Sequence, residues 1–194
     1  MRRLIGSKKT NIAVFISGTG SNFKNLIENS LKKKSKFKIN LVISNKSNAK
    51  GLNYAKRYKI NKKIISYKNI RSAERNILHI LKINKIDLIC LAGFMKILTN
   101  NFIQKFEGKI LNIHPSLLPK YKGLNTHLRA INNNEKFTGC TVHYVSSKLD
   151  SGKIILQKKV RILKKDTSHK LAKRVLKQEH LLYPKALKKV LTNL

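Results

Sequence analysis

Short apolar runs alternate with longer stretches of helical spacing through the first two thirds of this chain, and that alternation most constrains its fold. Strands buried on both faces are continuously apolar, whereas a surface helix repeats its apolar residues every three to four positions. The runs typical of strands are 11–17, 40–44, 63–66, 86–92 and 109–113. The stretches typical of helices are 22–33, 49–58, 72–84 and 100–106. This order predicts an α/β fold with a mostly parallel sheet and helices on both faces.

The last third of the chain departs from strict alternation. A short helix is expected over 126–132, and the runs 140–145 and 153–157 are close enough to pair directly, so the later strands should be partly antiparallel. A final amphipathic helix is expected over 168–181, interrupted at Pro184 before it resumes. The prediction is a single open domain of Rossmann-like architecture.

Composition agrees with one domain. A chain of 194 residues with 41% hydrophobic content can bury one sizeable core. No apolar run approaches the roughly 20 residues that cross a bilayer, and no signal-type apolar stretch follows the basic start. Cys90 and Cys140 each lie inside an apolar run, which favours buried thiols over a disulfide or a metal pair. We expect a cytoplasmic protein with no membrane partner.

The formal net charge of +35 raises the question of nucleic-acid binding. A surface that reads phosphates favours clustered arginine with interleaved aromatic rings. Here lysine outnumbers arginine 35 to 8, and the lysines are scattered along the chain without such aromatics. Drift of surface positions to lysine therefore explains the charge better, and we do not expect functional nucleic-acid binding.

A glycine loop, Ser-Gly-Thr-Gly-Ser-Asn at 17–22, separates the first expected strand from the first expected helix. Backbone N–H groups at such a junction, together with the helix N-terminus, favour a phosphate. A dinucleotide site would need a third glycine and an acid after the second strand, which instead ends in Ser44-Asn45-Lys46. A single phosphate monoester fits better. The alternative is a turn in which Ser21 or Asn22 caps the helix and no ligand binds.

Asn112 and His114 stand two positions apart at the end of an apolar run and before a Pro-rich turn. Side chains at such spacing in a strand share one face, so an amide donor and an imidazole should face a common space. Asp150 lies in a turn between two later strands. The three suit a reaction in which a carbonyl oxygen gains charge while a proton moves. Taken singly, His114 could be a core histidine and Asp150 a turn-capping residue.

Several motifs in order resemble the folate-dependent formyltransferase family, and within it the phosphoribosylglycinamide formyltransferases. The resemblance covers about residues 11–187 and rests on 17–22, Ala92-Gly-Phe-Met-Lys-Ile-Leu98, Asn112-Ile-His-Pro-Ser-Leu-Leu-Pro119, Gly139-Cys-Thr-Val-His-Tyr-Val145, Asp150-Ser-Gly152 and Gln178-Glu-His-Leu-Leu-Tyr-Pro184. It implies transfer of the formyl group of 10-formyltetrahydrofolate to the amine of glycinamide ribonucleotide, in purine (IMP) biosynthesis. The implied cofactor is thus a co-substrate, and no metal is implied.

The resemblance also implies a role for each site residue. Asn112 would donate to the developing oxyanion, His114 would stabilise that oxygen or move a proton, and Asp150 would raise the pKa of His114 and order a proton-relaying water. The remaining groups are the phosphate-binding residues Thr19, Gly20, Ser21 and Asn22, the ribose-binding Glu179, and the folate-binding Phe94, Met95, Lys96, Ile97, Leu98, Asn112 and Asp150.

The implied organisation is a basic extension at 1–10 and a formyltransferase domain at 11–194. Its phosphate-binding half would span about 11–108 and its folate and catalytic half about 109–194. The family pattern is broken at Lys153, where a small apolar residue is usual. The resemblance leaves open a monomer or a homodimer.

Three alternatives remain. A methionyl-tRNA formyltransferase-like enzyme shares the catalytic residues but normally carries a further tRNA-binding domain. A formyltetrahydrofolate hydrolase would need a regulatory domain before residue 11. A basic nucleic-acid-binding protein, from a different class, would not depend on Asn112, His114 or Asp150.

Overall fold

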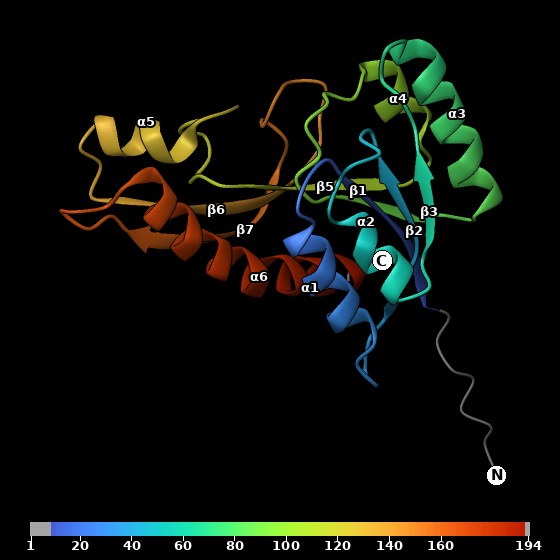
Figure 1. The fold of residues 1–194 in the computed structure, drawn as a ribbon, viewed down its shortest axis with the longest axis horizontal. Coiled ribbons are helices and arrows are strands. Elements are labelled where there is room, and N and C mark those ends of the chain that lie inside the picture. The colour runs from blue at the N-terminus through green and yellow to red at the C-terminus, as the bar shows by residue number, and fades with distance from the viewer. Residues whose placement is uncertain (1–8, 193–194) are drawn as a thin grey trace.

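The computed structural model describes residues 9–192, so residues 1–8 of the expected basic extension lie outside the described residues. Within that range the chain forms one seven-stranded sheet flanked by helices (Figure 1). The elements in chain order are β1 (Thr10–Ile16), α1 (Ser21–Ser30), β2 (Phe37–Ser44), α2 (Leu52–Arg57), β3 (Asn61–Ile64), α3 (Ile70–Ile83), β4 (Leu88–Leu91), α4 (Asn100–Lys105), β5 (Lys109–His114), α5 (Thr126–Asn132), β6 (Phe137–Tyr144), β7 (Ile154–Arg161) and α6 (Ser168–Thr192).

The strand order is β3-β2-β1-β4-β5-β6-β7, and the first five strands are parallel. Both β6 and β7 run antiparallel to their neighbours, as predicted. The chain reverses its direction of travel across the sheet at β1, which lies between β2 and β4. Ligands of open α/β sheets bind at such a switch point, beyond the carboxyl ends of the strands. The glycine loop follows β1 at this position.

Two buried clusters cover the two faces of the sheet, and β1 contributes to both. Ile12, Val14 and Ile16 face the cluster that contains α1 and α6. Ala13 and Phe15 face the opposite cluster, which contains α3 and α4. Figure 1 shows α1 and α6 on one side of the sheet and α3 with α4 on the other. Burial on both faces explains why β1 reads as a continuous apolar run.

Two expected elements differ from the structure. The strand predicted at 63–66 is found at Asn61–Ile64, and all four residues are exposed because β3 forms an edge of the sheet. The predicted interruption at Pro184 is wrong, since α6 continues through it to Thr192. Tyr183 and Leu187, on either side of the proline, are fully buried. Packing of this apolar face outweighs the loss of one backbone hydrogen bond at proline.

The two cysteines match the expectation. Cys90 and Cys140 are free and buried, in β4 and β6. Burial raises the pKa of each thiol to about 12, so neither is a reactive thiolate at neutral pH. No helix within residues 9–192 is long and apolar enough to span a membrane.

Candidate active site

Close backbone packing shapes the glycine loop. Gly20 has φ +72°, and a Cβ built there would lie 2.6 Å from the Cα of Gly51. The Gly51 N–H donates to the carbonyl of Gly18 at 3.0 Å, which ties the loop to the residue before α2. Only glycine combines that φ with that approach. The loop is therefore held in one conformation by main-chain contacts.

The N-terminus of α1 opens onto this loop. Gly20 is its N-cap residue, and within the described chain no side chain makes a capping hydrogen bond there. The alternative in which Ser21 or Asn22 caps the helix is therefore not what the structure shows. Uncapped N–H groups and the helix dipole favour an anion at this point.

Asn22 and Glu179 meet although they lie 157 positions apart. The Nδ2 of Asn22 donates to Glu179 Oε2 at 2.6 Å, where α1 packs against α6. Both residues are 8% exposed. Burial raises the pKa of the Glu179 carboxyl, and the hydrogen bond from Asn22 only partly opposes the shift. The structure thus brings the expected phosphate-binding and ribose-binding residues into direct contact.

Asn112, His114 and Asp150 come together as the sequence predicts. Asn112 and His114 lie on one face of β5, and Asp150 reaches them from the turn before β7 with φ +45°. The Asp150 carboxylate accepts from Asn112 Nδ2 at 3.4 Å and lies 3.3 Å from His114 Nδ1. The side chains of His114 and Asp150 are 6% and 8% exposed. An amide, an imidazole and a carboxylate therefore share one largely buried space.

The contacts of His114 define its protonation pattern. Its Nε2 lies 2.8 Å from the Tyr121 carbonyl, which can only accept, so Nε2 carries a hydrogen and Nδ1 faces Asp150. Burial lowers the pKa of His114, and the Tyr121 carbonyl and the Asp150 carboxylate oppose that effect. Asp150 thus acts in the expected direction, but burial outweighs it and the net shift is downward.

For the pKa of Asp150, the polar contacts outweigh burial. Burial alone would raise the pKa of its carboxyl, but hydrogen bonds from His143 and the Gly123 N–H lower it, as do the charges of His114 and His143. The net pKa lies below the ordinary value, so the group is a carboxylate at neutral pH.

His143 belongs to this site and was not among the residues predicted from sequence. It pairs with Asn112 across β5 and β6, with its Nε2 3.2 Å from Asn112 Nδ2 and 3.6 Å from Asp150 Oδ1. Its Nδ1 lies 2.8 Å from the Tyr144 carbonyl. Because the Tyr144 carbonyl can only accept, Nδ1 carries a hydrogen. The sequence feature that could have identified His143 is the motif at 139–145, if it is interpreted as a strand that pairs antiparallel with β5.

The segment expected to bind folate follows β4 and divides into two groups. Met95, Lys96 and Ile97 are exposed. Phe94 instead packs its ring against those of Phe15 and Tyr67, and Leu98 is 4% exposed within the core. The side chain of Leu98 is therefore not free to line an open pocket.

Ser17 ties this segment to the glycine loop and was also missed from sequence. Its Oγ accepts from the Met95 N–H at 2.8 Å and donates to Asn45 Oδ1 at 2.6 Å. The ends of three neighbouring strands, β1, β2 and β4, are thereby joined through one hydroxyl. The loop and the 94–98 segment consequently share one edge of the sheet.

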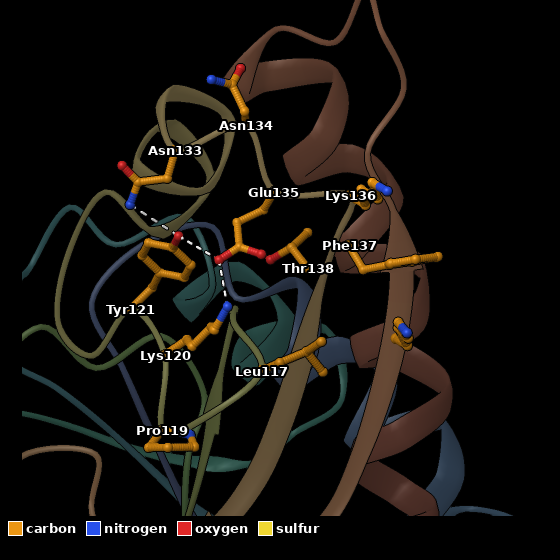
Figure 2. A pocket seen from close by; sticks show the side chains of 11 residues that line it. Leu117, Pro119, Lys120, Tyr121, Asn133, Asn134, Glu135, Lys136, Phe137 and Thr138 are labelled. Atoms are coloured by element: carbon orange, nitrogen blue, oxygen red, sulfur yellow. Dashed lines mark hydrogen bonds and ion pairs between the residues drawn. The ribbon is translucent and has the colours of Figure 1, made fainter.

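A cavity of about 640 Å³ lies apart from Asn112, His114 and Asp150. Its lining includes Lys120 and Tyr121 (Figure 2). Within residues 9–192, no group of three or more His, Cys, Asp or Glu side chains could hold a metal ion.

An amide, an imidazole and a carboxylate gathered at the end of β5 suit a group-transfer reaction, and comparison with known proteins identifies the family. The formyl transferase family matches residues 10–187, and the chain belongs to it. The chain is 45% identical to phosphoribosylglycinamide formyltransferase from Haemophilus influenzae, covering 91% of this chain and 85% of that protein.

Two further relatives extend the comparison. The chain is 46% identical to the human trifunctional purine biosynthetic protein adenosine-3 over 94% of its own length, but spans only 18% of that protein. The crystal structure of phosphoribosylglycinamide formyltransferase from Brucella melitensis superposes with a TM-score of 0.90 at 43% identity, covering 95% of this chain and 96% of that one.

Proposed function

We propose that this chain transfers the formyl group of 10-formyltetrahydrofolate to the amine of glycinamide ribonucleotide, yielding formylglycinamide ribonucleotide and tetrahydrofolate. The observation that carries the proposal is the convergence of Asn112, His114 and Asp150 in a member of the formyl transferase family. The glycine loop, with a helix N-terminus behind it, supports an acceptor that bears a phosphate monoester.

In this proposal the substrate amine attacks the formyl carbon, and the carbonyl oxygen becomes an oxyanion. Asn112 donates a hydrogen bond to that oxygen, and His114 stabilises it or transfers a proton. Asp150, held as a carboxylate, orders the water that carries a proton from the attacking amine to the folate nitrogen. The bond between that nitrogen and the formyl carbon then breaks as the oxyanion returns to a carbonyl, and tetrahydrofolate leaves. Burial lowers the pKa of His114, which favours the neutral ring at pH 7.

The proposed substrate-binding residues lie near the same edge of the sheet. Thr19, Gly20, Ser21 and Asn22 would hold the phosphate, and Glu179 the ribose hydroxyls. Met95, Lys96 and Ile97 would contact the folate through side chains or backbone, while Phe94 and Leu98 would shape that segment from the core. The proposed phosphate-binding half at about 11–108 and folate half at about 109–194 would adjoin in the sheet between β4 and β5. Cytoplasmic location and a monomer or homodimer remain predictions.

A formyl-transfer assay with two acceptors tests the proposal. Glycinamide ribonucleotide should be formylated, whereas initiator methionyl-tRNA should not; the reverse result would favour the tRNA-dependent alternative. Asn112→Ala, His114→Ala and Asp150→Asn should each lower turnover by about 100- to 1,000-fold. His79→Ala, which removes an exposed histidine of α3, is the matched control and should keep full turnover. Wild-type turnover in the first three variants would refute the assigned roles.

A further inference from the structure

The loop formed by Tyr121, Lys122, Gly123 and Leu124 (the 121–124 loop) contacts both titratable members of the candidate site through its backbone. The Tyr121 carbonyl lies 2.8 Å from His114 Nε2. The Gly123 N–H donates to Asp150 Oδ2 at 2.9 Å. Movement of this loop would therefore change the orientation of the imidazole and of the carboxylate together.

The loop contains one residue, Tyr121, whose backbone conformation is unfavourable for its type. Tyr121 has φ +57°, Gly123 has φ +78°, and Asn125, just after the loop, has φ +56°. Left-handed backbone disfavours side chains with a Cβ, and a tyrosine has no local hydrogen bond to compensate. Contacts from outside the loop must hold it in place.

Arg129, one turn into α5, supplies such contacts. Its Nη1 donates to the Lys122 carbonyl at 2.7 Å and lies 3.4 Å from the Leu124 carbonyl. Its guanidinium also lies over the ring of Tyr121, 5.3 Å from the centroid. The guanidinium donates to main-chain carbonyls while its plane lies over a ring, a geometry that the compact ammonium of lysine does not reproduce.

We propose that Arg129 is a positioning residue, which clamps the 121–124 loop so that Tyr121 and Gly123 hold His114 and Asp150 in their reactive geometry. This inference rests on the proposed function, because it assumes that His114 and Asp150 act in formyl transfer. Arg129 itself is exposed and does not contact the reacting groups. Its effect should therefore fall on the rate of the chemical step rather than on substrate binding.

The loop has a second attachment, so losing Arg129 should not unfold it. The Tyr121 hydroxyl donates to Glu135 Oε1 at 2.9 Å, and Lys120 Nζ reaches the same oxygen at 2.7 Å. Asn133 Nδ2 donates to the Tyr121 hydroxyl at 3.0 Å, as Figure 2 shows. Arg129 thus fixes the backbone of the loop, while Glu135 fixes the tip of one side chain.

Arg129→Gln and Arg129→Lys test the clamp in the formyl-transfer assay. Both should lower kcat about tenfold and change KM for either substrate by less than about threefold. Arg75→Gln, which removes the same charge from an exposed position on α3, is the matched control and should keep kcat within about twofold of the wild type. Melting curves check that all three variants are folded.

Two outcomes would overturn the proposal. A wild-type kcat in Arg129→Gln would show that the loop holds its conformation unaided. A wild-type kcat in Arg129→Lys would show that the planar guanidinium is not needed to hold the loop. Failure of the proposed function is separate, because it appears as no formylation of glycinamide ribonucleotide by the wild-type protein.

Discussion

Two carboxyl groups of the candidate site, those of Glu179 and Asp150, have pKa values that are shifted in opposite directions. Within the described residues, Glu179 receives one side-chain hydrogen bond, from Asn22, and burial raises its pKa. Asp150 is surrounded by a backbone N–H, an amide and two imidazoles, and its pKa is lowered. The donors around Asp150 outweigh the effect of its burial, whereas the single donor to Glu179 does not.

The loops beside these carboxylates differ in the same way. The glycine loop next to Glu179 is shaped by two backbones in contact, at Gly20 and Gly51. The 121–124 loop next to Asp150 is held by the side chains of Arg129 and Glu135. The conformation of the glycine loop thus depends on two positions that lack a side chain, whereas the conformation of the 121–124 loop depends on side-chain contacts. Substitutions should therefore disrupt the first abruptly and the second gradually.

Gly20→Ala should have the largest effect. The new methyl group would lie 2.6 Å from the Cα of Gly51, on a residue with φ +72°. We expect a loss of about 2–4 kcal/mol in the free energy of unfolding, since neither backbone can move without disturbing α1 or α2. Denaturant unfolding measures this loss, and KM for the phosphate-bearing substrate should rise as well.

Gly18→Ala is the control in the same loop. A Cβ at Gly18 would meet no atom within 4 Å, and its φ is not positive. Stability should remain within about 0.5 kcal/mol of the wild type. Equal losses in the two variants would contradict the claim that contact with Gly51 shapes the loop.

Asp150→Asn should destabilise the protein at neutral pH and not in acid. A carboxyl whose folded pKa is depressed contributes stability above its unfolded pKa and loses it as the pH falls through the folded value. The melting temperature of the variant should therefore lie several degrees below that of the wild type at pH 7, and the gap should close below about pH 4. A constant gap would show that the carboxylate is not specifically stabilised.

Glu179→Gln should give a smaller effect of the opposite sign. A carboxyl whose folded pKa is raised is best accommodated when protonated, so its contribution is lost as the pH rises from the unfolded pKa through the folded one. Glutamine keeps an acceptor for Asn22 without the charge. The variant should match the wild type near pH 4 and melt about 2–4 °C higher at pH 8, while formyl transfer falls. A lower melting point at pH 8 would refute the desolvation argument.

Local patterns in the sequence predicted the strands and the helices well, because buried strands and amphipathic helices leave a periodic signal. The predicted helix at 126–132 is α5 itself. His143 was not predicted as a site residue, because its role depends on the register in which β6 pairs with β5, and no local pattern encodes that register. The uninterrupted α6 at Pro184 and the burial of Leu98 likewise depend on packing between distant segments.

The contact between Asn22 and Glu179 shows the same limit for the site. Each residue was predicted to bind a different part of one substrate, and they meet through the packing of α1 on α6. The φ of Tyr121 is harder still, since nothing in Lys-Tyr-Lys-Gly predicts left-handed backbone at a tyrosine. Contacts made by groups outside a loop, such as Arg129 for the 121–124 loop and Gly51 for the glycine loop, are what the local sequence pattern does not predict.

Tyr121→Phe should have the smallest effect and separates the two attachments of the 121–124 loop. It removes the hydroxyl bonded to Glu135 but leaves the carbonyl on His114 and the ring under Arg129. Glu135 keeps its partner Lys120, so no buried charge is left unpaired. We expect a loss of about 0.5–1.5 kcal/mol in stability and a decrease in kcat of less than about threefold.

Tyr58→Phe, on a tyrosine without a side-chain hydrogen bond among the described residues, is the control. If Tyr121→Phe lowered kcat as much as Arg129→Gln, the ring would hold the loop from its hydroxyl end, and the backbone clamp would not be needed to explain the geometry of His114.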